Sequence, residues 1–93
     1  MNPLLISDNL LTFFDSTGAR HLKSVLLTTN QLSSVDLSSN PSLETLVISD
    51  NNLVNIDLSA NMGLTYFYAS SNMLTSLDVS RNKELIDLRV DRN

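Results

Sequence analysis

The apolar residues of this chain follow a spacing that fits neither a helix nor a long strand. From residue 22 onward, a set of positions that carry apolar residues or asparagine is separated by alternating steps of three and two, with a second step of three at the end of each repeat. They are Leu22, Val25, Leu27, Asn30, Leu32, Val35, Leu37, Asn40 and Leu43. Steps of two fit short extended segments with alternating side chains, whereas steps of three require the backbone to turn before it points inward again. The pattern therefore predicts a chain that winds around an apolar interior.

This pattern recurs with a period of twenty-one residues. Residues 43–63 read LETLVISDNNLVNIDLSANMG, with LKSVLLTTNQLSSVDLSSNPS before them and LTYFYASSNMLTSLDVSRNKE after them. We divide a single domain, 1–93, into the repeats 1–21, 22–42, 43–63 and 64–84 and a partial repeat, 85–93. The first repeat is degenerate, because Ser16 and Ala19 replace a leucine and an asparagine of the later repeats. An atypical terminal repeat is expected, since it lacks a neighbour on one side.

Turns of this kind stack so that equivalent segments pair as parallel strands about 4.7–4.9 Å apart. The strands are expected near residues 24–27, 45–48, 66–69 and 87–90. A second, weaker ladder is expected through 34–37, 55–58 and 76–79. A turn of twenty-one residues leaves little room for helix.

Each repeat contains one motif twice in overlap, as LETLVISDN followed by LVNIDLSAN. LxxLxLxxNxL is the leucine-rich-repeat signature, whose period is about 20–29 residues. The chain therefore resembles the nested bacterial class of leucine-rich-repeat proteins called IRREKO. The resemblance implies a leucine-rich-repeat solenoid, a right-handed coil of short parallel strands with little or no helix. It also implies a bacterial protein that is secreted or attached to the cell surface.

Two columns of asparagine recur in phase with the repeat. They are Asn30, Asn51 and Asn72, continued by Asn93, and Asn40, Asn61 and Asn82. An inward amide at a corner can bond backbone groups that the turn leaves unpaired, and in the resembling family such residues form asparagine ladders. We therefore predict a structural role for both columns.

A column of aspartates occupies the second half of each repeat, at Asp15, Asp36, Asp57 and Asp78. One interpretation is a cation site, but calcium requires several converging oxygens and usually a glycine-permitted turn, and no such glycines are present. The interpretation that we favour is that each carboxylate bonds nearby hydroxyl and N–H groups. We therefore predict no metal and no cofactor.

The two halves of the repeat differ in how much they vary. The outward position of the second half is always aspartate, whereas the first half carries aliphatic, aromatic and charged residues in turn. Tyrosine is enriched at interfaces because it joins a large apolar area to a polar tip. The predicted ligand-binding residues are Leu26, Thr45, Val47, Tyr66, Tyr68, Asp87 and Arg89. The alternative is that Tyr68, Val47 and Leu26 only pack against one another across the strands.

Composition argues against several other classes of function. The net charge of −4 makes nucleic acid a poor partner, and no apolar run approaches the roughly 20 residues of a membrane span. There is no cysteine, and the N-terminal residues lack the features of a signal peptide. A hydrolytic triad needs a base and a nucleophile in contact, and the sequence places no serine beside His21, its one histidine. We therefore expect no catalytic residues.

The leading hypothesis is a non-enzymatic module that binds another protein through its variable strand face. The alternative is a structural or self-assembling repeat element, either a fragment of a longer array or a building block for one. Such an element would associate with itself through the ends of the coil. A third interpretation is an ice- or glycan-binding surface along the column Ser7, Thr28, Ser49 and Ser70, but its hydroxyls are mostly those of serine, which lacks the methyl group that such surfaces usually present. At the C-terminal side, the mixed charges from Arg81 to Arg92 are of a kind that discourages pairing at a sheet edge.

Overall fold

The computed structural model describes residues 22–93 together with the backbone of residues 4–5 and 13–15. Most of the degenerate first repeat, including Ser7 and His21, lies outside the described residues.

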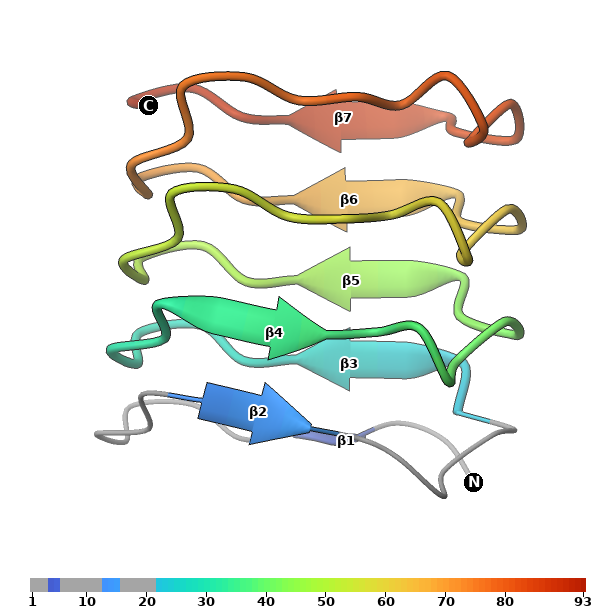
Figure 1. Cartoon of the computed structure of the whole chain (residues 1–93), viewed down its shortest axis with the longest axis horizontal. Helices are drawn as coiled ribbons and strands as arrows, with labels where there is room; N and C mark the ends of the chain where they lie inside the picture. Colours follow the sequence, from blue (N-terminus) through green and yellow to red (C-terminus); the bar gives the residue numbers. More distant parts are fainter. Residues whose placement is uncertain (1–3, 6–12, 16–21) are drawn as a thin grey trace.

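Short parallel strands dominate the described part of the chain, which contains no helix. One sheet has five strands in the order β1-β3-β5-β6-β7 (Figure 1). These strands are β1 (Leu4–Leu5), β3 (Ser24–Leu26), β5 (Thr45–Val47), β6 (Tyr66–Tyr68) and β7 (Asp87–Arg89). All pair in parallel, and every partner lies twenty-one residues away, as in Leu46↔Phe67 and Phe67↔Leu88. The four strands predicted for the first half-repeats are therefore confirmed, each one residue shorter than expected.

The second ladder is shorter than predicted. It consists of β4 (Ser34–Asp36) paired with β2 (Phe13–Asp15), and residues 55–58 and 76–79 form no strand. The described turns are joined at the start of this half, where the Asn52 N–H donates to the Leu32 carbonyl and the Met73 N–H donates to the Leu53 carbonyl, each at 2.8 Å. One such bond between two turns is not enough to form a ladder. The prediction of strands at 55–58 and 76–79 was wrong.

The core lies between the five-stranded sheet and the second halves of the repeats, which run in front of it (Figure 1). The middle residue of each inner strand is fully buried, namely Val25, Leu46 and Phe67. Phe67 is larger than Leu46, and two residues further on Ala69 is smaller than Ile48. Conserving total volume in this way is how a core tolerates substitution, so one large ring and one small side chain fit the same space.

The corner after each strand contains a residue in the left-handed backbone region. Thr29, Asp50, Ser71 and Arg92 have φ angles of 56°, 59°, 57° and 60°. Each comes directly before an asparagine of the first column. Because of the positive φ angle at this residue, the chain turns away from the strand, and the side-chain amide of the following asparagine points inward.

Candidate functional site

The outward side of the five-stranded sheet, from β3 to β7, carries all seven predicted binding residues; we call it the strand face. The register aligns Ser24, Thr45, Tyr66 and Asp87 in one column and Leu26, Val47, Tyr68 and Arg89 in the next. Most of these side chains are half-buried by their neighbours, whereas Tyr66 and Arg89 are exposed, Tyr66 to 39%. The strand face thus carries one hydroxyl and one aliphatic residue on each of β3 and β5, aromatic residues on β6 and charged residues on β7.

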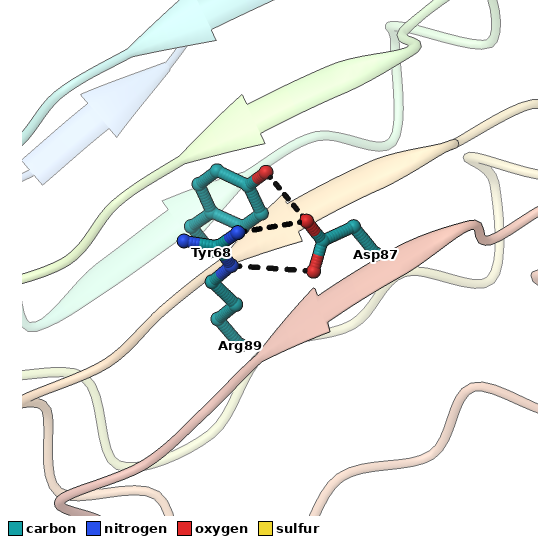
Figure 2. Close-up of polar contacts among 3 residues, drawn as sticks. All are labelled: Tyr68, Asp87 and Arg89. Atoms are coloured by element: carbon teal, nitrogen blue, oxygen red, sulfur yellow. Dashed lines mark hydrogen bonds and ion pairs between the residues drawn. The ribbon is translucent and has the colours of Figure 1, made fainter.

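Tyr68, Asp87 and Arg89 form one connected group on this face (Figure 2). The Tyr68 hydroxyl donates a hydrogen bond of 2.9 Å to Oδ2 of Asp87. The guanidinium of Arg89 donates through Nη2 to the same oxygen at 3.1 Å and through Nε to Oδ1 at 3.3 Å. Arg89 also lies over the Tyr68 ring, 4.7 Å from its centroid, which is a cation–π geometry. Two strands are therefore joined by side chains as well as by backbone bonds.

The hydrogen bonds and charges of Tyr68, Asp87 and Arg89 stabilise the same protonation state of the group. Hydrogen bonds from Arg89 and Tyr68 hold the pKa of Asp87 below its ordinary value. The hydrogen bond to Asp87 raises the pKa of Tyr68, and the same carboxylate raises the pKa of Arg89. At neutral pH the group consists of an ion pair and a neutral phenol, all held in one arrangement.

The two tyrosines consequently differ in what they can offer a ligand. Tyr68 has its hydroxyl and one side of its ring occupied by Asp87 and Arg89. Among the described residues, none forms a hydrogen bond with the Tyr66 hydroxyl. Tyr66 therefore presents both an accessible ring and a polar tip.

A third outward column follows the second one along the strands. Ser70 donates its hydroxyl to the carboxylate of Asp91, which lowers the pKa of that carboxyl. Asp91 was not among the binding residues predicted from the sequence. The signal that would have found it is the period itself, because Asp91 lies twenty-one residues after Ser70.

The aspartates of the second half-repeat are used locally. Oδ1 of Asp36, Asp57 and Asp78 accepts the backbone N–H two residues further on, at 3.1, 2.9 and 2.9 Å. Hydrogen bonds from the side chains and backbones of Ser38, Ser59 and Ser80 lower the pKa of these three carboxyls. Within the described part of the chain, no three acidic, histidine or cysteine side chains gather into a group that could hold a metal ion. The side chain of Asp15 lies outside the described residues.

The first asparagine column links successive turns. Nδ2 of Asn51 donates to the Ile48 carbonyl in its own turn at 2.9 Å and to the Leu27 carbonyl in the previous turn at 3.0 Å. Its Oδ1 accepts the Leu32 N–H at 3.1 Å. Asn72 and Asn93 repeat the arrangement one and two turns later.

The second asparagine column, at the opposite corner, is also buried. Nδ2 of Asn61 donates to the carbonyls of Leu37 and Asn40, at 3.2 and 2.9 Å. Asn82 makes the equivalent bonds to Leu58 and Asn61. Both columns therefore satisfy backbone carbonyls inside the molecule, away from the strand face.

Comparison with family models, with curated proteins and with solved structures found no match to this chain. None of the described residues belongs to a helix long and apolar enough to cross a membrane.

Proposed function

We propose that this chain is a leucine-rich-repeat solenoid and that it binds another protein, without catalysis, through the strand face. The observation that supports this proposal most is the exposure of the aromatic side chain of Tyr66. Tyr66 is 39% exposed and lies between the half-buried Thr45 and Val47 on β5 and the charged residues of β7.

Binding energy at protein interfaces is concentrated in a few residues, and tyrosine and arginine are the types most enriched among them. A rigid anchor also loses less conformational entropy on binding than a mobile one. Tyr68 and Arg89 are held by Asp87 before any ligand arrives, so they form a fixed platform beside Tyr66. Leu26, Thr45 and Val47 extend the same face toward the N-terminal strands.

The proposal is tested by site-specific photocrosslinking. A photoreactive phenylalanine analogue replaces Tyr66 in one variant and Met73 in a control variant, because Met73 is 52% exposed but belongs to the other half of the repeat. We expect position 66 to form covalent adducts with another protein. An excess of unlabelled wild-type chain should prevent these adducts by competition, whereas an excess of the Tyr66→Ala chain should not. Equal adducts from both positions, or competition by the alanine variant, would remove the strand face as the binding site.

The double variant Tyr66→Ala, Tyr68→Ala should abolish partner binding while the chain remains folded, as judged by circular dichroism. Unchanged affinity of the double variant contradicts the proposal.

The second candidate function is a self-assembling repeat element. One specific observation favours it. Apolar side chains are exposed at the C-terminal end of the sheet, where Ile86 is 74% and Leu88 is 41% exposed.

A further inference from the structure

The inward residues of β7, at the end of the sheet, are less covered than those of the inner strands. In the described part of the chain β7 pairs with β6 alone. Leu88 is 41% exposed, although its partners in the register, Leu46 and Phe67, are fully buried. Val90, two residues further on, is also partly accessible, although its equivalents Ile48 and Ala69 are buried. Ile86, just before β7, is 74% exposed, at a position that also reaches solvent in the earlier turns. The edge therefore presents apolar side chains at three alternate positions.

The same edge presents backbone groups in a defined pattern. The Ile48 and Ala69 N–H groups donate to carbonyls of the following turn, each at 2.8 Å. Val90 is the equivalent residue of the last turn, so its N–H points to the open side. The carbonyls of Glu44 and Thr65 accept bonds of 2.8 Å from the following turn, and Ile86 is their equivalent. Because alternate residues of a strand direct their polar groups to the same side, Leu88 also presents its N–H and carbonyl there.

The outward residues of β7 carry opposite charges on either side of Leu88, in the order Asp87, Leu88, Arg89. In a parallel, in-register pair of two such strands, like charges would lie opposite each other, which is destabilising. In an antiparallel pair centred on Leu88, each Asp87 lies opposite the partner's Arg89. The charges of Asp87 and Arg89 thus disfavour parallel pairing of two β7 strands and favour antiparallel pairing.

We propose that two copies of this chain associate through β7 as a two-fold symmetric dimer with antiparallel pairing centred on Leu88. Leu88 lies opposite the partner's Leu88, and Ile86 lies opposite the partner's Val90. The Val90 N–H donates to the partner's Ile86 carbonyl, while the two Leu88 residues exchange N–H···O=C bonds. Closed two-fold symmetry is the commonest arrangement of protein oligomers, and strand addition at a free edge is an established mode of recognition.

The dimer has a direct consequence for the molecule's surface. A two-fold axis perpendicular to the sheet keeps the outward side of both copies on the same side. The two sheets become one, and the two strand faces form a single continuous surface with a charged centre. The dimer does not depend on whether the strand face binds another protein, and neither proposal requires the other.

The test is sedimentation equilibrium of the 93-residue chain over a wide range of concentration. We expect a monomer–dimer equilibrium for the wild-type chain. Arg89→Asp places an aspartate opposite the partner's Asp87 twice per dimer and should raise the dissociation constant by about tenfold or more. The charge swap Asp87→Arg, Arg89→Asp restores opposite charges and should return the dissociation constant to within about threefold of wild type.

A second variant separates pairing from folding. Val90→Pro removes an N–H that makes no bond among the described residues, and proline is tolerated on an edge strand whose N–H faces solvent. We expect this variant to keep the wild-type circular dichroism spectrum and to raise the dissociation constant by about tenfold. The Tyr66→Ala chain should dimerise like the wild type, which distinguishes the dimer from strand-face recognition.

Three results overturn the proposal. They are a wild-type chain that remains monomeric up to about millimolar concentration, open-ended oligomers in place of a dimer, and a charge-swap variant that dissociates as readily as Arg89→Asp.

Discussion

The left-handed corner residues show how a repeat imposes a conformation on unsuitable side chains. An L-residue in this region brings its Cβ close to a carbonyl oxygen, at a cost of about 1–2 kcal/mol. Aspartate tolerates the conformation better, but Thr29 is β-branched, and its φ is 56°. Thr29 is therefore the least favourable of the four positions.

Thr29→Gly should raise the free energy of unfolding by about 0.5–1 kcal/mol, because the relief of strain exceeds the entropy that glycine loses on folding. Urea denaturation monitored by circular dichroism measures the change. The matched control is Thr28→Gly, one residue earlier with an ordinary φ, which should lower the free energy of unfolding. A loss of stability in both variants would show that the corner at Thr29 carries no strain.

These corners could not be predicted residue by residue. The usual signals for a left-handed residue are glycine and asparagine, and the four positions hold threonine, aspartate, serine and arginine. Only the twenty-one-residue period, together with the asparagine that follows each corner, marks them as equivalent. The backbone conformation is set by the packing of the whole turn and not by the residue that adopts it.

At the scale of the elements, the asparagine columns take part in the bonding between turns. Asn51 bonds the carbonyls of two successive turns and accepts an N–H from the earlier one. Asn93 makes the same set of bonds at the exposed end of the molecule. The two residues therefore differ mainly in burial.

Asn51→Ala should lower the free energy of unfolding by about 3 kcal/mol, because buried carbonyls and an N–H lose their partners and water cannot replace them. Asn93→Ala should cost only about 1 kcal/mol, since water reaches the same groups at the exposed end. Urea denaturation of the two variants measures both losses in the free energy of unfolding. Equal losses would mean that burial does not determine the strength of this column.

The sequence predicts the first-half strands well and the second-half ladder poorly. The LxxLxL motif specifies which residues alternate, so the positions of β3, β5, β6 and β7 follow from it. In the second half, the apolar spacing of 34–37 is the same as that of 55–58 and 76–79, yet only the first of these segments contains a strand, β4, so the spacing alone does not predict which segments pair. The contact of Tyr68 with Asp87 was also missed, because it runs diagonally between columns and the spacing aligns only residues twenty-one apart.

For the whole molecule, the uniform register means that a complete repeat is the unit of structure. Every described pairing joins residues twenty-one apart. Removing one full repeat would leave all remaining pairs in register, whereas removing part of one would shift every later residue. The stability of repeat proteins is approximately a sum over repeats and their interfaces.

Deletion of residues 43–63 should give a folded chain of lower stability in which Leu26 lies beside Tyr68. Deletion of residues 43–52 alone should abolish cooperative unfolding, because each later first half would then lie beside a second half of the neighbouring turn and could not pair with it. Circular dichroism and urea denaturation of both variants provide the measurement. A folded half-repeat deletion, or an unfolded full-repeat deletion, contradicts the register as the basis of the fold.

The edge position of β7 also affects its local stability, because β5 and β6 pair on both sides and β7 pairs with β6 alone in the described part of the chain. Detaching β7 breaks backbone bonds to one strand only, so its amides should exchange more readily than those of β5 and β6. Asp87 and Arg89 leave together with β7, whereas Tyr66 and Tyr68 remain on β6. Opening of β7 would thus convert the strand face from a form with charges fixed over Tyr68 to a form with two bare tyrosines. A ligand that prefers either form shifts their populations, and the exchange rates of the amides from 86 to 90 report which form it selects.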